Sequence, residues 1–242
     1  MSGPTPTVAV VVPTYNEADN LHKLMSGLFD LKIPNLQLIL VDDGSPDGTG
    51  NLAKELGEEL DGCVTIIQRG RKMGLGTAYV AGFTKALSIG AQFVVQMDAD
   101  LSHELQYIPM FLSKLEKADV VVGSRYVPNG GVAKTWTVSR RALSTIGNLG
   151  IRVASGVHVK DATSGFKAYR SEVLQSFDME QFRSKGFAFQ VEVAYACERK
   201  GYRIHEHPIV FASRLMGKSK MSFSIVLEAL WKLPTLRWVK TP

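Results

Sequence analysis

The chain has 242 residues, of which 45% are hydrophobic, and this size and composition fit one globular domain with a sizeable core. A formal net charge of +5 suits anionic partners, but no long run of Lys and Arg with interleaved aromatic residues indicates nucleic acid. Cys63 and Cys197 form no Cys-x-x-Cys motif and have no histidine nearby, which argues against a disulfide framework and a zinc site.

Membrane spans and export signals are also missing from the sequence pattern. No stretch reaches the roughly 18 uninterrupted apolar residues of a membrane span. Residues 1–8 lack the basic-then-apolar layout of a signal peptide. We therefore expect a cytoplasmic location.

Apolar runs alternate with amphipathic stretches of helical length over the first two thirds of the chain. This alternation predicts an α/β fold with a mostly parallel, doubly wound sheet. The predicted strands are Val8–Val12, Leu36–Val41, Val64–Ile67, Phe93–Met97 and Val120–Val122, and the predicted helices are Glu17–Phe29, Pro46–Leu60, Gly76–Ile89 and Leu105–Lys117.

The pattern changes after Arg125, where a loop rich in Gly and Pro begins. We predict helices at 139–155 and 187–200, a strand at 166–169, paired extended segments at 203–207 and 209–212, and an apolar helix at 222–233. Because no linker or internal repeat divides the chain, we expect a single domain over residues 1–242, with one part at 1–125 and a second at 126–221.

Polar residues follow four of the predicted strands. They are Asn16-Glu17, Asp42-Asp43, Asp98-Ala99-Asp100 and Ser124-Arg125-Tyr126. The carboxyl ends of parallel strands share one edge, where open α/β sheets bind ligands, so we expect these loops to form one site.

The most informative stretch is Val94–Asp100, an apolar run that ends in two carboxylates one residue apart. Mg²⁺ and Mn²⁺ prefer oxygen ligands and commonly take one or two carboxylates, leaving their other positions to water and phosphate. In isolation, Asp-x-Asp fits a strand-ending turn with a helix cap equally well. Convergence with the other acidic loops favours the metal site.

The loops after the first two strands carry residues suited to a nucleotide. Tyr15 offers a ring for base stacking and Glu17 an acceptor for a base, although Asn16 or Glu17 could instead cap the next helix. Two adjacent acids, Asp42 and Asp43, exceed what capping needs, so one of them is expected to hold a ribose or base edge. The Gly-Leu-Gly sequence at 74–76 lacks the spacing of a phosphate-loop fingerprint and predicts a tight turn into a helix.

A set of motifs occurs in one order and closely resembles dolichol-phosphate (polyprenol-phosphate) mannosyltransferases, which are inverting glycosyltransferases of family 2 with a GT-A fold. The resemblance spans roughly residues 8–222. The motifs are Pro13–Glu17, Asp42–Thr49, Gly74–Ala78, Met97–His103, Gly123–Tyr126 and Thr163–Phe166.

The resemblance implies a role for each matching residue. Asp98, Asp100 and Arg125 would be catalytic, and residues 1–125 would bind the nucleotide sugar while 126–221 face the acceptor. The substrate-binding residues would be Pro13, Tyr15, Glu17, Val41 and Asp43 at the guanosine, Asp98, Ala99 and Asp100 at the diphosphate, and Arg125, Arg214 and Lys220 at phosphate.

The implied cofactor is Mg²⁺ or Mn²⁺, with Asp100 as direct ligand, Asp98 close to metal or sugar, and Ser102 at a position where some relatives carry Gln. His103-Glu104 replaces the His-Pro of relatives. Arg214 and Lys220 would belong to a mobile basic loop at 213–220, for which the alternative is a solvated basic turn. Lys134, Arg140 and Arg141 are further candidates to steer a lipid phosphate.

The implied reaction is inverting transfer of mannose from GDP-mannose to dolichyl or polyprenyl phosphate, giving a β-linked product. An acceptor phosphate with a second pKa of about 6 is largely dianionic at neutral pH and needs no base. This agrees with a structural interpretation of the five histidines, His22, His103, His158, His205 and His207. Rival hypotheses are a UDP-glucose or UDP-GlcNAc donor, or a nucleotide-binding regulatory or scaffold subunit.

The acceptor lipid implies contact with a membrane. We expect a membrane-interface helix within 222–242, where apolar residues follow helical spacing with Trp, Lys and Arg nearby, although this helix could equally pack on the core or on a partner subunit. The expected location is peripheral, on the cytoplasmic face of the plasma membrane in a prokaryote or of the endoplasmic reticulum in a eukaryote. A small membrane-anchoring subunit is a possible partner.

Overall fold

The structure, a computed structural model of the chain, describes residues 6–60, 62–184 and 186–212. Within this part, strands form one seven-stranded sheet in the order β3-β2-β1-β4-β7-β5-β8. The strands are β1 (Val8–Thr14), β2 (Leu36–Asp42), β3 (Val64–Gln68), β4 (Phe93–Gln96), β5 (Val120–Ser124), β7 (Lys167–Arg170) and β8 (Ile204–Pro208). The predicted doubly wound α/β fold is confirmed.

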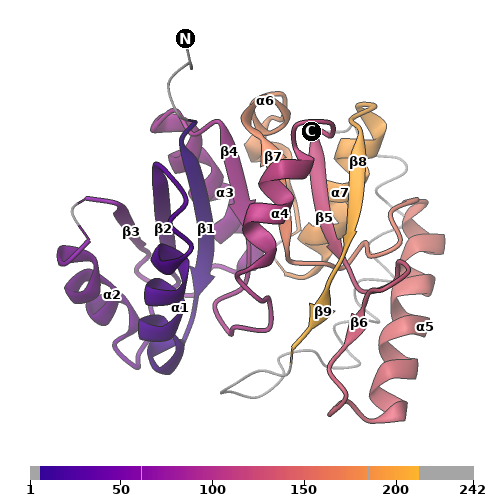
Figure 1. Cartoon of the computed structure of the whole chain (residues 1–242), viewed down its shortest axis with the longest axis horizontal. Helices are drawn as coiled ribbons and strands as arrows, with labels where there is room; N and C mark the ends of the chain where they lie inside the picture. The colour runs from indigo at the N-terminus through magenta and orange to yellow at the C-terminus, as the bar shows by residue number, and fades with distance from the viewer. Residues whose placement is uncertain (1–5, 61, 185, 213–242) are drawn as a thin grey trace.

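The sheet is parallel except for β7, which lies antiparallel between β4 and β5. The parallel strands therefore run in one direction, and β1 can be followed from the top of Figure 1 to the bottom. The lower edge in this view is the carboxyl edge of the sheet.

The extended segments at 203–207 and 209–212 do not pair with each other, so that prediction is wrong. β8 pairs parallel with β5, and β9 (Val210–Phe211) pairs parallel with β6 (Gly131–Val132) in a small second sheet. Only Ile209 separates β8 from β9, whereas a hairpin needs a loop of about two residues. The chain therefore continues forward into the second sheet.

Helices cover both faces of the large sheet because successive strand residues point to opposite sides. Val8, Val10 and Val12 of β1 join one hydrophobic cluster, and Ala9 and Val11 join the other. The first cluster includes α1 (Ala18–Asp30), α2 (Thr49–Glu58) and α4 (Tyr107–Lys114), of which α1 and α4 lie in front of the sheet in Figure 1.

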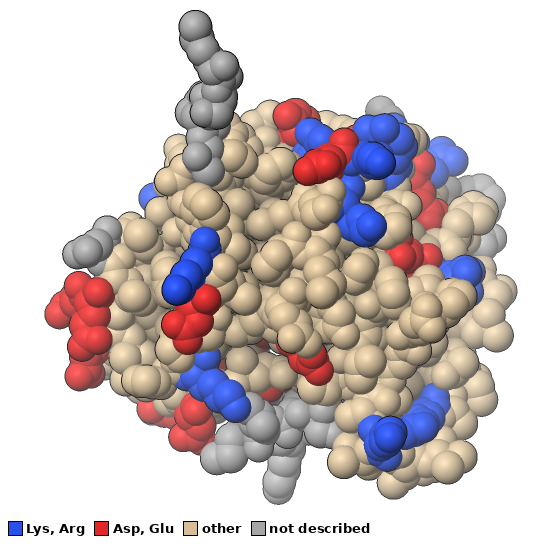
Figure 2. Space-filling model, viewed as in Figure 1, with Lys and Arg blue, Asp and Glu red and all other residues tan. Residues whose placement is uncertain are grey.

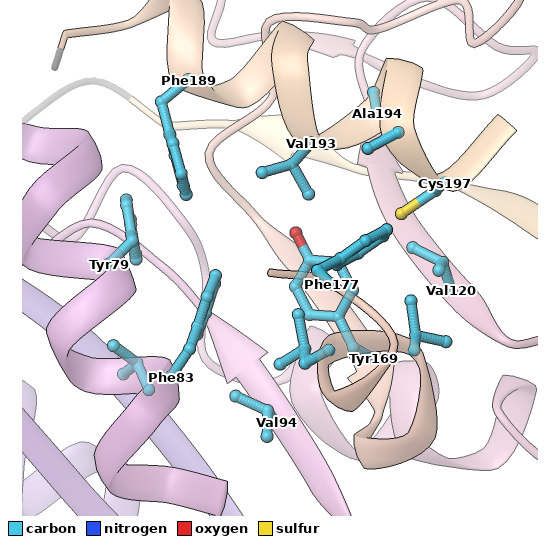
Figure 3. Packing of buried hydrophobic residues seen from close by; sticks show 14 of the residues in the cluster. Tyr79, Phe83, Val94, Val120, Tyr169, Phe177, Phe189, Val193, Ala194 and Cys197 are labelled. Carbon is cyan, nitrogen blue, oxygen red and sulfur yellow. The ribbon is translucent and has the colours of Figure 1, made fainter. Parts of the chain in front are cut away.

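The second cluster lies on the opposite face and is rich in aromatic rings. Tyr79 and Phe83 of α3 (Leu75–Ser88) contact Phe189 of α7 (Ala188–Arg199), and Phe83 contacts Tyr169 of β7 edge to face. Figure 3 shows these rings filling the space between α3 and α7. The same cluster includes residues of α6 (Ser171–Gln175) and α5 (Val138–Ser155), and the short helix η1 spans Met179–Gln181.

The described residues contain no helix that combines the length and apolar character needed to cross a membrane. Figure 2 shows a largely uncharged middle on the face drawn there, with basic side chains gathered over the lower end of α5. The predicted basic loop at 213–220 and the predicted helix at 222–233 lie outside the described residues.

Candidate functional site

The loops after β1, β2 and β4 begin side by side at the carboxyl edge of the sheet. Thr14 at the end of β1 is in register with Asp42 at the end of β2, and the Asp43 amide donates to the Thr14 carbonyl at 3.0 Å. On the other side of β1, the Met97 amide donates to the Val11 carbonyl at 3.2 Å. The predicted convergence of the acidic loops is therefore present.

Asp42 organises the loop that follows β2. Its carboxylate accepts from the Thr14 hydroxyl at 3.2 Å and from the Ser45 amide at 3.1 Å, and it is 4% exposed. The Ser45 hydroxyl in turn accepts from the Asn16 amide at 3.0 Å. Thus the loop after β2 holds the backbone of the loop after β1.

The interpretation of Asn16 or Glu17 as helix caps is not supported. Glu17 is the residue before α1, but its side chain makes no capping hydrogen bond and accepts instead from the Asn20 amide group at 2.8 Å. The Glu17 and Ala18 amides are bound by Thr49 Oγ1 at 3.0 Å and Asp47 Oδ2 at 3.2 Å. Capping of α1 is therefore supplied across space by the loop after β2.

Asp43 fastens the segment that precedes α3. Its Oδ2 atom accepts from the Met73 amide at 3.1 Å and the Gly74 amide at 2.9 Å, and Oδ1 forms an ion pair with Arg69. Arg69 also donates to Thr77 Oγ1 at 2.7 Å. This role of Arg69 is not predictable from the sequence, because an ion pair between loops 26 positions apart leaves no local spacing pattern.

Tyr15 faces the same segment. The Lys72 Nζ atom lies 4.1 Å from the centroid of the Tyr15 ring, a cation–π contact. Pro13, Tyr15 and Glu17 are partly exposed, as nucleotide contacts require, whereas the Val41 side chain is fully buried in the core. Because the whole Val41 residue is 0% exposed, backbone included, a nucleotide contact by Val41 remains a prediction without an exposed atom to support it.

Asp98 is half-buried and is held from several sides. Its Oδ1 atom accepts from the Tyr79 hydroxyl at 3.1 Å, and its amide donates to His103 Nδ1 at 3.3 Å. A Cβ placed on Gly165 would lie 3.1 Å and 3.2 Å from the two carboxylate oxygens. The Asp98 carboxylate therefore rests against the backbone of the loop before β7.

His103 has the structural role predicted for it. It is 3% exposed, and its ring stacks on Phe166 with centroids 4.9 Å apart. Burial lowers the pKa of His103, although Asp98 and Asp100 oppose that effect. A neutral ring that accepts at Nδ1 fixes the backbone at Asp98.

Asp100 and Ser102 form a tight local turn. Asp100 Oδ1 accepts from the Ser102 amide at 3.0 Å and from the Ser102 hydroxyl at 2.6 Å. Leu101 between them has a φ of 57°, which orients the turn. Ser102 is fully buried, and its hydroxyl contacts Asp100. Ligation of a metal by Ser102 remains a prediction.

The donor set fits a hard divalent cation that takes few protein ligands. Among the described residues no three His, Cys, Asp or Glu side chains are grouped to hold a metal. Asp98 and Asp100 supply two carboxylates separated by the buried Ala99. Mg²⁺ commonly binds through one or two carboxylates together with substrate phosphates, so these residues suit a cation that arrives with a diphosphate.

Arg125 at the end of β5 is clamped by Asp161. Nε donates to Asp161 Oδ2 at 2.7 Å, Nη2 donates to Oδ1 at 2.7 Å, and Nη2 also donates to Thr163 Oγ1 at 2.8 Å. Burial alone would raise the pKa of Asp161, but the Arg125 guanidinium holds it below its usual value. Asp161 was not among the predicted site residues, although it lies two residues before the Thr163–Phe166 motif.

Two of the other predicted basic residues, Arg140 and Arg141, have defined contacts beside α5. Arg140 stacks over the Trp136 ring at 3.8 Å, and Arg141 donates to the Ala133 and Lys134 carbonyls at 3.2 Å. These contacts place both arginines at the first turn of α5. Arg214 and Lys220 lie outside the described residues.

Residues 9–177 match the model of Glycosyl transferase family 2. The chain is a family 2 glycosyltransferase. This glycosyltransferase is 42% identical over 231 residues to an undecaprenyl-phosphate mannosyltransferase of Micrococcus luteus, covering 96% of this chain and 93% of the relative. It is also 42% identical over 231 residues to a polyprenol monophosphomannose synthase of Mycolicibacterium smegmatis, covering 95% and 86%. The resemblance stated from the motifs is confirmed.

Solved structures confirm the GT-A fold of the glycosyltransferase. Glucosyl-3-phosphoglycerate synthase from Mycobacterium tuberculosis, in complex with Mn²⁺, uridine diphosphate and glucosyl-3-phosphoglycerate, aligns with a TM-score of 0.65 at 18% identity, covering 96% of this chain and 78% of that one. Its complex with Mn²⁺, uridine diphosphate and phosphoglyceric acid aligns with a TM-score of 0.67 at 16% identity, covering 96% and 77%. At these identities the likeness concerns the fold alone.

Proposed function

We propose that this glycosyltransferase transfers mannose from GDP-mannose to a polyprenyl phosphate, with inversion at the anomeric carbon. The observation that carries the proposal is the 42% identity, over nearly the whole chain, to two proteins named for mannose and a polyprenyl phosphate. The arrangement of the carboxyl edge of the sheet supports it, since this edge carries an aromatic ring and carboxylates suited to a nucleotide, two carboxylates suited to a metal diphosphate and an arginine suited to an anionic acceptor.

The donor would lie across the loops after β1, β2 and β4. Tyr15 and Glu17 would face the guanine, and Asp43 would contact the ribose while keeping residues 69–74 in place. Asp98 and Asp100 would hold the divalent cation with the donor diphosphate. Two structures of the same fold contain Mn²⁺ with uridine diphosphate, which supports a divalent cation as the cofactor. The cation would supply positive charge to the departing GDP.

The acceptor phosphate would attack without a general base, because it is largely dianionic at neutral pH. The main barrier is then repulsion between two anionic groups, which positive side chains reduce. The Nε and Nη2 atoms of Arg125 already donate to Asp161 and Thr163. A phosphate contact by Arg125 would therefore use its remaining N–H groups, those of Nη1. Arg214 and Lys220 would add positive charge.

A donor assay with purified protein and polyprenyl phosphate in detergent micelles tests this function. GDP-mannose, UDP-glucose and UDP-GlcNAc, each labelled in the sugar, are supplied separately with Mg²⁺ or Mn²⁺. We expect label in the lipid only from GDP-mannose. Transfer from a UDP-sugar alone would replace the donor, and nucleotide binding without any transfer would favour a regulatory or scaffold subunit.

We also propose that the enzyme reaches its lipid from the membrane surface through α5. Five of the eight exposed large hydrophobic side chains among the described residues belong to this helix: Val138 (83% exposed), Leu143 (52%), Ile146 (68%), Leu149 (54%) and Val153 (69%). Their spacing places them on one face. Exposed basic residues at the first turn, over the lower end of α5 in Figure 2, suit anionic lipid headgroups.

Flotation with anionic phospholipid vesicles tests this surface. The double variant Ile146→Glu with Val153→Glu should bind about tenfold more weakly, because two apolar side chains lose their burial in lipid. Met110→Glu is the matched control, since Met110 is 47% exposed on α4. Unchanged flotation of the double variant contradicts the proposed membrane contact. A wild-type protein that is dimeric, with a monomeric double variant, also contradicts it, because α5 would then be a contact between subunits.

A further inference from the structure

A lysine is buried behind the acidic loop and takes no part in the chemistry described so far. Lys167 on β7 is 1% exposed. Its Nζ atom donates to the Ser164 carbonyl at 2.5 Å, to Gln190 Oε1 at 2.7 Å and to the Gln190 carbonyl at 3.4 Å. All three acceptors are neutral, so this is not an ion pair.

The lysine belongs to a buried polar network that joins three elements. Gln190 Oε1 on α7 also accepts from the Gln96 side chain on β4, and Gln96 Oε1 accepts from the Tyr169 hydroxyl on β7 at 2.8 Å. Each of these side chains is at most 1% exposed. A buried polar group without partners is costly. Among the described residues, Gln190 Nε2 is the one side-chain polar atom of this network without a partner, and the remaining bonds favour one arrangement of these elements.

Two paths lead from this network to Asp98. The first path runs along β4. Lys167 is in register with Gln96, the last residue of β4, and Asp98 follows Gln96 by two positions. The second path runs through the backbone before β7: Lys167 binds the Ser164 carbonyl, and the next residue, Gly165, lies against both Asp98 oxygens. The Tyr79 hydroxyl then holds Asp98 Oδ1 at 3.1 Å.

We infer that Lys167 is a positioning residue for sugar transfer, which sets the Ser164–Gly165 backbone against Asp98 and so fixes where that carboxylate acts. The inference rests on the proposed role of Asp98 at the donor. An apolar side chain of similar length would fill the same space, but it would leave the Ser164 carbonyl without its donor. The loop would then be free to move away, and Asp98 with it.

The test compares Lys167→Met and Lys167→Arg with the surface control Lys54→Met on α2, where the lysine is exposed. We expect Lys167→Met to fold and to lose about 10- to 100-fold in kcat, with the KM for donor changing much less, because a small misplacement costs rate. Lys167→Arg keeps donors for both carbonyls and should recover most of the rate. Lys54→Met should match the wild type.

A second variant displaces the Asp98 carboxylate directly, and it tests the inference if Lys167→Met does not fold. In Gly165→Ala the added methyl meets the Asp98 oxygens at 3.1 Å and 3.2 Å, whereas a Cβ on Gly131 meets nothing within 4 Å, so Gly131→Ala is its control. Gly165→Ala should lower kcat as Lys167→Met does.

Calorimetry of Mn²⁺ with GDP gives a readout that does not depend on turnover. Lys167→Met and Gly165→Ala should bind this pair more weakly than the wild type and the controls. Folded Lys167→Met or Gly165→Ala with wild-type kcat and wild-type Mn²⁺–GDP affinity overturns the inference. Failure of the proposed function is distinct, since the wild type itself would then neither transfer mannose nor bind Mn²⁺ with GDP.

Discussion

Asp161 grips the guanidinium of Arg125 with both carboxylate oxygens, each at 2.7 Å, and also accepts from the Arg125 amide at 3.0 Å. The Asp161 amide is itself held by Glu206 Oε1 of β8 at 3.0 Å. Arg125 is thus fixed by a chain of contacts that starts on the edge strand of the sheet. The arginine proposed to contact phosphate is therefore positioned by a chain of hydrogen bonds through Asp161 and Glu206.

Breaking this clamp should affect both stability and rate. In Asp161→Asn the Arg125 side chain, only 12% exposed, keeps its charge and loses its counterion, so we expect about 3 to 5 kcal/mol less free energy of unfolding, measured by urea denaturation. The kcat should fall about 100-fold because Arg125 is no longer aimed.

The Asp119–Arg203 pair gives a matched control for that variant. It is also a two-oxygen contact, with Nη2 to Oδ1 at 3.0 Å, but the Arg203 side chain is 67% exposed. Solvent screens an exposed pair, so Asp119→Asn should leave rate and stability nearly unchanged. Equal losses in the two variants would contradict the role given to Asp161.

The burial of Lys167 predicts a pH dependence of stability. Burial lowers the pKa of Lys167 from 10.5 to about 7, against the opposing influence of Cys197, Asp161 and Asp98 and with a smaller lowering effect of Arg125. Between pH 7 and 10.5 the unfolded chain therefore holds a proton that the folded chain has released. Stability should rise with pH in this window and should be lost as pH falls towards 7.

Urea unfolding at pH 7, 8 and 9 measures this effect. The wild type should gain up to about 1.4 kcal/mol per pH unit relative to Lys167→Met, which lacks the titrating amine. Below pH 7 both states of the wild type are protonated, so the difference should become constant. Parallel pH profiles of wild type and variant from pH 7 to 9 would show that Lys167 is charged throughout.

Gly76 is required because the chain passes close to it. A Cβ on Gly76 would lie 2.0 Å from the Ser184 carbonyl oxygen. Gly76→Ala should therefore destabilise the protein by about 1 to 3 kcal/mol, as overpacking does. A Cβ on Gly70 meets nothing within 4 Å, so thermal unfolding of Gly70→Ala should resemble that of the wild type.

Asp43 should matter for donor binding more than for the chemical step. Its carboxylate binds the Met73 and Gly74 amides, and Asp43→Ala would release residues 69–74 from Tyr15. We expect the KM for GDP-mannose to rise about tenfold with a smaller change in kcat, the result of losing binding shared by ground and transition states. Asp30→Ala, at the exposed end of α1, is the control. A fall in kcat alone would place Asp43 at the reacting centre.

The sequence predicted the sheet and the position of the acidic loops because both follow from periodic local patterns. In Val94–Asp100 the carboxylates directly follow the apolar run, so they lie at the sheet edge once this strand is paired. The partners of these residues were not predictable in the same way. Arg69 meets Asp43, and Asp161 meets Arg125, only after distant segments have folded together, and the pairing of β8 with β5 depends on tertiary packing.

Two further predicted contributors, Arg214 and Lys220, can be tested by substitution. Arg214→Ala should abolish mannose transfer, because the proposed mechanism needs positive charge to reduce repulsion between the acceptor phosphate and the donor diphosphate. Binding of GDP with Mn²⁺ should persist in this variant. Wild-type turnover by Arg214→Ala would remove the basic segment from the mechanism.

In the proposed reaction Asp98 and Asp100 would hold a divalent cation, which would supply positive charge to the departing GDP while the ionised lipid phosphate attacks. The most direct test measures mannose transfer from GDP-mannose to polyprenyl phosphate under exhaustive chelation, then after adding back Mg²⁺ or Mn²⁺, for wild type and Asp100→Ala. We predict no transfer with chelator, full recovery in the wild type and none in Asp100→Ala. Undiminished turnover in chelator, or restored turnover in Asp100→Ala, would contradict it.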